Sequence, residues 1–456
     1  FEKGYTDKTT LFDVKTEFNS SCSPDGTSTD KKCYNPDNYD NAFRGPMTLR
    51  DGLAQSINII AVKLLYLVGV SDSIKMAHNL GITTLKNDPN IYGLSLVIGG
   101  GETTLLDMTS VYGVFANSGI RNPQTGILSI QDSSGTVLEK FESNPQQIIK
   151  SNTANILSSI LIDNEARTPT FGANSILKIQ GREVAVKTGT TNNNKDAWTV
   201  GYTPSLAVGV WVGNNDNKPM KKGGAALAGP IWNGIMTESL KNFPVESFEK
   251  PEPIDASIPA VLRGFWQGGD TFVIDSISGG LATEYTPIEL RKETSITNVH
   301  TILHWIDKNN PLQLKNTPGN SDTQYTNWEY GIQKWWELNK YKYPTITESN
   351  KPSFYDTIHN NESKPVFEIS GIENKTYQKD ENITIMISSS SKNMINKVDV
   401  FINNTYLTSL KSYPFSTSFL PNNISDISKN NTIKIIGVDN QGNIGENTIS
   451  FKVDTI

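Results

Sequence analysis

An apolar strand that runs directly into a polar edge constrains the fold of this chain most. Residues 177–187, and residues 184–187 most clearly, are predicted to run as a strand into the sequence Lys187-Thr188-Gly189-Thr190. Residues 197–201 and 206–212 are two further short runs rich in β-branched and aromatic residues, which is typical of strands. The three runs predict a late antiparallel sheet that presents an ammonium group, two hydroxyls and a bare glycine at one edge.

Helical patterns precede and follow this sheet in the sequence. A capping box from Thr48 to Asp51 opens a short predicted helix, and Gly69 is the expected stop of the next one. The predicted helices cover residues 49–55, 59–68, 105–116, 148–164 and 229–240. Helices combined with a late antiparallel sheet predict an α/β sandwich and not a parallel doubly wound fold.

Ser56 and Asn58 fall on the predicted turn between the first two helices, where polar side chains can point into a cleft. Taken singly, Ser56 is more often a helix cap and Asn58 a turn residue. An ammonium group, hydroxyls and an edge-strand N–H suit a substrate carboxylate and a developing oxyanion. Together with Lys187, the two residues favour an acyl-transfer site over the alternative, an edge strand with a solvent-exposed lysine.

Length and charge exclude several classes of function. The 456 residues allow two to four domains, and the formal net charge of −6 argues against a nucleic-acid partner. No run reaches the roughly 18 apolar residues of a membrane span. Residues 1–4 resemble the end of a helix with a glycine stop, so we expect the sequence to begin inside a domain.

Two cysteines bracket a short polar loop. Cys22 and Cys33 are the only cysteines of the chain. A disulfide formed in an oxidising compartment is favoured, and two free thiols are the alternative. A zinc site is not favoured because no histidine lies near them in the sequence.

The character of the sequence changes near residue 245. Residues 249–253 are typical of a linker, and residues 254–350 are expected to be irregular and rich in tryptophan. Alternating apolar positions then predict strands at residues 383–387, 398–402, 433–438 and 449–453, as in a β-sandwich of immunoglobulin type. We therefore expect three parts: 1–245, 246–362 and 363–456.

The first part resembles the transpeptidase domain of class A penicillin-binding proteins, relatives of the class A β-lactamases. The segments that carry this resemblance are residues 38–40, 43–50, 53–58, 94–102, 115–117, 186–191 and 209–220. Residues 254–345 also resemble the C-terminal extension of that family. The resemblance implies the fold of that family, an antiparallel sheet with helices, followed by the aromatic extension and the terminal sandwich.

The resemblance also implies peptidoglycan cross-linking through a serine acyl-enzyme, inhibited by penicillin. Ser56 would relay protons, and Asn58 would bind the substrate amide and steady the lysine of the nucleophile. Lys187 would supply positive charge, and the hydroxyls of Thr188 and Thr190 would bind the substrate carboxylate. Gly189 would let the substrate backbone approach, and the Thr190 N–H would form half of the oxyanion hole. No cofactor or metal is implied.

The nucleophile of the family is not found in a credible setting. A serine three residues before a lysine occurs at Ser28, Ser175, Ser247 and Ser389, but no apolar helix surrounds any of them. In the family the nucleophile lies on a helix before the point that matches residue 1, so we expect this stretch of sequence to be inactive by itself. The alternatives are a non-catalytic module that binds peptidoglycan or partner proteins, and a β-lactamase or carboxypeptidase.

The remaining candidates are weaker. His300 and His304 are spaced like two metal ligands on a helix, but without a third ligand a partly buried packing pair is favoured. The tryptophans of residues 328–336 are expected to pack in a core or an interface rather than stack on sugars. The resemblance implies peptidoglycan stem peptides, β-lactams and cell-wall synthesis proteins as partners. It also implies the extracytoplasmic face of a bacterial membrane, reached through an upstream anchor.

Overall fold

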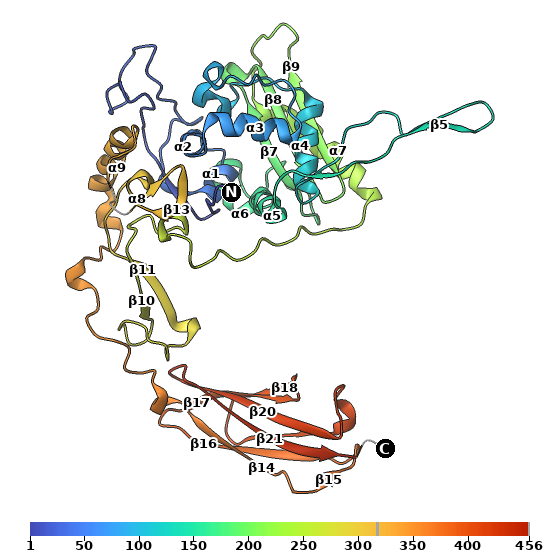
Figure 1. Ribbon diagram of the computed structural model, residues 1–456, viewed down its shortest axis with the longest axis vertical. Helices are drawn as coiled ribbons and strands as arrows, with labels where there is room; N and C mark the ends of the chain where they lie inside the picture. Colours follow the sequence, from blue (N-terminus) through green and yellow to red (C-terminus); the bar gives the residue numbers. More distant parts are fainter. Residues whose placement is uncertain (316–318, 455–456) are drawn as a thin grey trace. The chain divides into compact units, whose positions relative to one another are not determined.

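The computed structural model describes residues 1–315 and 319–454, which divide into two compact units. The first unit comprises Phe1–Gly269 and Thr297–Thr345, and the second comprises Asp270–Ile296 and Ile346–Ile456 (Figure 1). The division into parts at residues 245 and 362 stays a prediction.

The first unit holds the described α-helices and a group of small antiparallel sheets. Its helices are α1 (Leu49–Ala54), α2 (Asn58–Val68), α3 (Val70–Leu80), α4 (Leu105–Ala116), α5 (Ser151–Leu161), α6 (Asn164–Phe171), α7 (Gly224–Ser239), α8 (Ile302–Trp305) and α9 (Tyr325–Asn339). Its strands are β1 (Thr10–Asp13), β2 (Gly45–Thr48), β3 (Ile120–Arg121), β4 (Ser129–Gln131), β5 (Val137–Lys140), β6 (Gln146–Gln147), β7 (Ala185–Thr190), β8 (Asp196–Tyr202), β9 (Ala207–Gly213), β12 (Ile306–Asp307) and β13 (Asn310–Leu314).

The predicted late sheet is present as β7-β8-β9, with both pairs antiparallel. Successive side chains of a strand point to opposite faces. Val186 packs with Trp232 of α7 on one face, whereas Ala185 packs with Leu161 of α5 and with α4 residues on the other. The sheet therefore lies between α7 and a helical layer that includes α4 and α5, which confirms the predicted sandwich of helices and antiparallel sheet (Figure 1).

The helices with strong end signals lie where the sequence predicts them. Thr48 caps α1 by accepting a hydrogen bond from the Asp51 backbone N–H, and Gly69 ends α2. Helix α4 has the predicted bounds. The apolar face of α2 packs in the largest core cluster of this unit together with Trp305 and Trp328.

Three boundaries were predicted wrongly. The helix predicted over residues 148–164 is two helices, because the Asp163 side chain accepts a hydrogen bond from the Ala166 N–H and so caps a new helix, α6. The strand predicted to span residues 177–187 is extended only from Ala185 onward, since Gly181 turns the chain with a φ of +71°. Helix α7 begins at Gly224, ahead of the predicted start at residue 229.

The aromatic segment after residue 254 is not irregular throughout. Helix α9 was missed, because aromatic residues on several of its sides hide the period of its buried residues Trp328 and Ile332. Trp335 of this helix makes an edge-to-face contact with Phe12 of β1, and Trp266 does the same. The predicted packing of the tryptophans is confirmed for Trp328, which is buried.

Strands β4 and β5 form a hairpin arm, residues 127–141, that extends away from the rest of its unit (Figure 1). Both strands are exposed along their whole length. The arm nevertheless carries apolar side chains, namely Ile127, Leu128, Ile130, Val137 and Leu138.

The second unit contains one hairpin and two larger sheets. The hairpin pairs β10 (Thr271–Asp275) with β11 (Arg291–Ser295). One sheet has the order β14-β16-β19 and the other β15-β21-β20-β17-β18. The bounds are β14 (Val366–Ser370), β15 (Thr376–Tyr377), β16 (Ile383–Ser390), β17 (Ile395–Ile402), β18 (Thr405–Leu410), β19 (Phe415–Phe419), β20 (Asn430–Asp439) and β21 (Ile444–Val453). Side chains from both sheets share one apolar core, and the predicted strands at 383, 398, 433 and 449 are confirmed.

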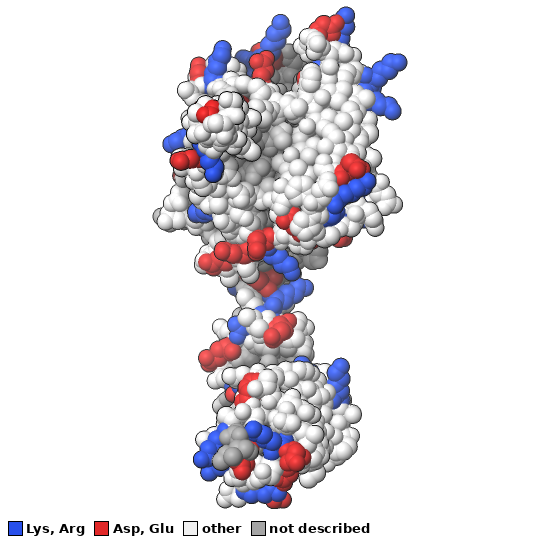
Figure 2. Space-filling view, turned by 90° about the vertical axis from the view of Figure 1, so that its right-hand side faces the viewer, with Lys and Arg blue, Asp and Glu red and all other residues white. Residues whose placement is uncertain are grey.

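Charge is mixed on one face of the molecule. On the face that Figure 2 shows, basic and acidic side chains lie interspersed instead of gathering into a field of one sign. Among the described residues, no helix combines the length and apolar character that a membrane crossing requires.

Candidate active site

A direct contact joins two of the predicted site residues. The Lys187 Nζ donates a hydrogen bond to the Ser56 Oγ at 2.6 Å, although 131 positions separate the two residues in the sequence. Lys187 lies in β7 and Ser56 in the turn between α1 and α2. By the alternation of a strand, Lys187 points to the same face as Ala185, which is the face that packs against α5.

The backbone holds Ser56 in an uncommon conformation. Its φ is +62°, a left-handed value that is rare for a residue other than glycine. The tight corner that requires it is closed by a hydrogen bond from the Ile57 N–H to the Gly52 carbonyl at 2.9 Å. Gly52 permits this corner, because a Cβ there would lie 2.5 Å from the Ile60 side chain. Such strain is a feature of functional sites, and it leaves the Ser56 side chain exposed beside Lys187.

Lys187 has an ammonium group that loses its proton more readily than usual. Burial of the group lowers its pKa from 10.5 to about 8, and the nearby positive charge of Arg167 acts in the same direction. The Nζ also donates to the Thr188 carbonyl at 2.9 Å. Beside the lysine lies a cavity of about 10 Å³, lined by Ala54, Ile160, Leu161, Arg167, Phe171, Leu177, Val186, Lys187 and Thr188. Arg167, buried in α6, was not predicted as a site residue, and no motif in the sequence marks it.

Strand β7 is an edge strand of its sheet within the described part of the chain. The N–H of Thr191 donates to the Asp196 carbonyl of β8. In an antiparallel pair the bonded and non-bonded residue pairs alternate. The N–H and C=O groups of Thr190 and Thr188 therefore point to the open edge, which is the edge where the Lys187 ammonium contacts the Thr188 carbonyl.

The N-terminus of α7 fixes the hydroxyl of Thr190. The Gly224 N–H donates to the Thr190 Oγ1 at 2.9 Å, so the hydroxyl proton remains available to a substrate. Gly224 has to be a glycine, because a Cβ would collide with the Gly189 carbonyl oxygen and lie 2.8 Å from that of Trp198.

The turn after β7 is braced by polar contacts. The Thr191 hydroxyl donates to the Asp196 Oδ2 at 2.8 Å, and the Trp211 Nε1 donates to the Asp196 Oδ1 at 2.9 Å. These contacts fix the end of the strand that carries the predicted Lys187-Thr188-Gly189-Thr190 residues. Sequence reasoning assigned no role to Asp196, although an Asp after the turn is a familiar signal of turn bracing.

Asn58 lies at a different position from the one predicted. It is the first residue of α2 instead of a turn residue. Its Nδ2 donates to the Asp37 carbonyl at 2.9 Å, so part of its amide is used to hold the chain that precedes α1. The structure thus brings Ser56 and Lys187 into direct contact and places Asn58 two residues beyond Ser56, at the start of the following helix.

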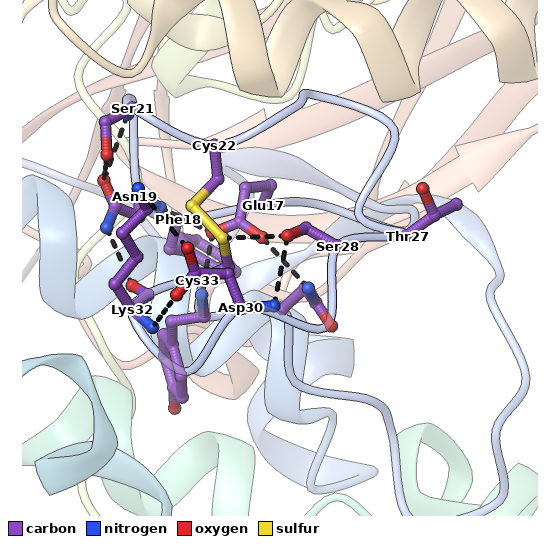
Figure 3. Close-up of a disulfide and its surroundings, with 12 residues drawn as sticks. Glu17, Phe18, Asn19, Ser21, Cys22, Thr27, Ser28, Asp30, Lys32 and Cys33 are labelled. Atoms are coloured by element: carbon purple, nitrogen blue, oxygen red, sulfur yellow. Dashed lines mark hydrogen bonds and ion pairs between the residues drawn. A yellow bond between two sulfur atoms is a disulfide. The ribbon is translucent and has the colours of Figure 1, made fainter.

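The serine-x-x-lysine sequences do not form a second site. Ser28 lies in the loop closed by the Cys22–Cys33 disulfide, which confirms the predicted bond (Figure 3). Its Oγ is 3.3 Å from the Cys33 Sγ and accepts from the Asp30 N–H. Lys31 is exposed, so the ammonium is not desolvated as an activating lysine would be. Ser175, Ser247 and Ser389 likewise lie outside helices.

Two groups of possible metal ligands in the first unit are already engaged in contacts within the protein. Glu17 lies near both cysteines, but their sulfurs are bonded to each other, and its carboxylate accepts hydrogen bonds from the backbone of Asn19 and Tyr34 (Figure 3). The rings of His300 and His304 stack with centroids 4.0 Å apart, and the His300 Nδ1 lies 2.7 Å from the Glu329 Oε1. Both rings are partly buried, as predicted for a packing pair.

The sequence of this part of the chain is similar to that of known proteins. The family model described as "Penicillin binding protein transpeptidase domain" matches residues 11–237. The penicillin-binding protein 1A of Aquifex aeolicus is 36% identical over 222 residues, which is 47% of this chain and 29% of that protein. That of Neisseria lactamica is 32% identical over 231 residues, or 49% of this chain and 28% of that protein. The chain thus spans less than a third of the length of these relatives.

Solved structures give weaker matches. The penicillin-binding protein PonA1 of Mycobacterium tuberculosis has a TM-score of 0.47 at 25% identity, over 56% of this chain and 68% of that one. The penicillin-binding protein 1A of Haemophilus influenzae has a TM-score of 0.46 at 23% identity, over 65% of this chain and 47% of that one. The family assignment therefore rests on the sequence match, and residues 11–237 belong to the transpeptidase domain family of class A penicillin-binding proteins.

Proposed function

We propose that this chain carries the proton-relay and carboxylate-binding side of a serine D,D-transpeptidase that cross-links peptidoglycan and is blocked by penicillin. The observation that carries the proposal is the contact of 2.6 Å between Ser56 and a lysine whose pKa burial lowers to about 8. A pKa near the working pH suits an acid–base group, because it is then populated in both protonation states.

The proton relay would run through Ser56. Its hydroxyl accepts a hydrogen bond from Lys187, so its own proton is free to pass to the leaving amine during acylation. That transfer would leave a negative charge on the Ser56 oxygen, stabilised by the Lys187 ammonium. In the second half of the reaction this oxygen would take a proton from the attacking amine and become a hydroxyl again. Asn58 would bind the substrate amide with the amide oxygen that its contact with Asp37 leaves free and steady the lysine of the nucleophile.

The substrate would lie along the open edge of β7. The hydroxyls of Thr188 and Thr190 would bind the terminal carboxylate, and Gly189 would leave room for its backbone. The Thr190 N–H, directed to this edge, would be one oxyanion donor, which is typically worth about 10²–10³ in rate. Acyl transfer through a covalent serine intermediate needs no metal or cofactor at this edge.

We propose further that residues 1–456 do not form an acyl-enzyme by themselves. The serines that precede a lysine by three residues lie in loops or in the second unit, and the Lys31 beside Ser28 is exposed. Because none of these serines lies beside a buried lysine that could activate it, they also favour the second candidate function, a module that binds peptidoglycan or a partner protein without turnover.

Labelling with a fluorescent penicillin, read by intact mass, tests both proposals. It is applied to this chain and to the chain extended by the upstream sequence of its reading frame, after each has given a cooperative unfolding transition. Label on the extended chain alone, lost in Ser56→Ala and retained in the control Ser71→Ala on α3, is the expected result. Label on the shorter chain would overturn its inactivity, and label on neither would favour the binding module.

The remaining parts of the proposal concern the whole protein. We propose an immunoglobulin-type sandwich for residues 363–456, preceded by the family's extension over residues 246–362 and the transpeptidase part over 1–245. A place on the extracytoplasmic face of a bacterial membrane agrees with the disulfide between Cys22 and Cys33, since such bonds persist in oxidising compartments. Limited proteolysis with mass analysis of the fragments tests the boundaries.

A further inference from the structure

The second unit holds a buried cluster of two carboxylates and one imidazole, formed by Asp275, Asp356 and His359. Asp275 ends β10, and the other two follow in the segment before β14. The side chains of both aspartates are 0% exposed and that of His359 is 1% exposed. One ligand atom from each residue lies within 4.8 Å of those of the other two.

The histidine ring has acceptors on both sides. Its Nε2 lies 2.8 Å from the Gln441 carbonyl, and its Nδ1 lies 2.6 Å from the Asp356 Oδ2. A neutral imidazole has one N–H and therefore can donate to only one of these oxygens. The Nδ1 contact then needs either a further proton, on the ring or on the Asp356 carboxyl, or a metal ion at Nδ1.

Hydrogen bonding and charge within the cluster distinguish its two carboxylates. The Asp356 carboxylate is well satisfied, because its Oδ2 also accepts from the Thr286 hydroxyl at 2.6 Å and its Oδ1 from the backbone N–H groups of Ile358 and His359. With a second ring proton, two carboxylates still face one positive charge, and Asp275 is the less compensated of the two. The Asp275 Oδ2 accepts from the Ser278 N–H and lies 3.7 Å from the His359 Nδ1, but its buried Oδ1 has no hydrogen-bond partner within residues 1–315 and 319–454. In that same part of the chain, neither aspartate pairs with a lysine or arginine. A buried charge without compensation is costly.

We propose that Asp275, Asp356 and His359 bind one divalent cation of the zinc or manganese class. Two positive charges balance the two carboxylates, and the unpartnered Asp275 oxygen gains a ligand bond. The Gln441 carbonyl then holds the Nε2–H, which is the usual arrangement around a metal-bound histidine. One imidazole with two carboxylates suits zinc or manganese better than calcium or magnesium. Bonds of about 2.1 Å in a tetrahedral geometry set the ligand atoms roughly 3.4 Å apart. The Asp275 Oδ2, 3.7 Å from the Nδ1, would therefore move closer, and the Asp356 Oδ2, 2.6 Å from it, would move away to admit the ion.

The ion would tie three separate segments of the second unit together. They are the end of β10, the segment of residues 356–359 and the turn between β20 and β21 that contains Gln441. Because all three ligands are buried, a substrate could not reach the ion, and its role would be structural.

Metal titration of the full chain tests the proposal. The chain is freed of metal with a chelator, and zinc or manganese chloride is then added in a calorimeter, with metal content measured after desalting. One ion per chain and a higher melting temperature with metal than with chelator are expected. Asp275→Asn keeps the size of the side chain and its bond from Ser278 but loses the charge, so it should weaken binding at least tenfold. The matched control His300→Gln should bind as the unaltered chain does.

Three results would overturn the proposal. The first is an equal melting temperature of the unaltered chain with metal and with chelator. This measurement does not depend on whether a variant folds. The second is equal affinity in Asp275→Asn and the unaltered chain. The third is binding that is lost in His300→Gln, because the ion would then sit at the stacked histidines of the first unit.

Discussion

The buried Lys63 allows the pH dependence of stability to be predicted in magnitude. This lysine of α2 is 1% exposed, and its Nζ donates to the Phe12 carbonyl at 2.7 Å and lies 5.2 Å from the centre of a Trp328 ring. Burial lowers its pKa from 10.5 to about 7, and the charge of Asp13 opposes this only in part. Because the folded-state pKa is the lower one, the unfolded chain binds the proton more tightly. The group therefore destabilises the fold.

The magnitude follows from the shift. Lowering the pKa from 10.5 to about 7 corresponds to roughly 5 kcal/mol at about 1.4 kcal/mol per unit. This cost is complete below pH 7 and disappears as the pH rises toward 10.5, so stability increases with pH by up to about 1.4 kcal/mol per unit in that window. Methionine in place of Lys63 removes the charge, but it leaves the Phe12 carbonyl without its hydrogen-bond donor, which destabilises the fold by about 1–3 kcal/mol. The net expectation at pH 7 is a gain of roughly 2–4 kcal/mol.

Urea unfolding between pH 6 and pH 10, followed by tryptophan fluorescence, measures the effect, since Trp328 lies against the lysine. Lys63→Met should be more stable than the unaltered chain at pH 7, and the difference should shrink and change sign toward pH 10. The control is Lys75→Met, which alters an exposed lysine of α3. A difference between Lys63→Met and the unaltered chain that stays constant over this pH range would refute the reasoning.

The remaining predictions concern backbone and covalent constraints, each measured by the free energy of unfolding in urea. Ser56→Gly should be about 1 kcal/mol more stable than Ser56→Ala because of its left-handed φ, and equal stability would contradict a strained corner. Removing the disulfide by Cys22→Ser with Cys33→Ser should cost about 3 kcal/mol, given a sequence separation of 11; no loss would mean that the loop is ordered without it. Gly224→Ala should cost about 1–3 kcal/mol, because its methyl group meets carbonyl oxygens of β7 and β8. The control is Gly234→Ala on the same helix, where an added Cβ has no atom within 4 Å, so this variant should gain up to about 1 kcal/mol. An equal change in the free energy of unfolding of the two variants would exclude the predicted collision.

Local signals made much of the first unit predictable. Thr48 and Gly69 mark helix ends through contacts with residues only a few positions away, and such contacts can be read from the sequence. Asp163 carries the same kind of signal, but the apolar run that precedes it concealed it. Helix α9 lacks a side-chain cap at Gln324, so its start has no marker in the sequence.

The site was predictable only as far as its motifs reach. Ser56 and Lys187 could be paired because each belongs to a recognisable motif, although no local rule brings residues 131 positions apart into contact. Arg167 and Lys63 owe their effects to tertiary burial, which a sequence pattern does not specify. The cluster around His359 was missed for the same reason, since the β20–β21 turn that holds its ring is distant in the sequence.

The hairpin arm formed by β4 and β5 has a consequence for handling the protein. A two-stranded hairpin without a core is at most marginally stable in water, and both strands of this arm are exposed. A protease should therefore cut it before it cuts the sheet that carries Lys187. The two fragments should remain associated, because α4 before the arm and α5 after it both pack on that sheet. A preparation nicked in the arm should keep the contact between Ser56 and Lys187 and still appear as two bands on a denaturing gel.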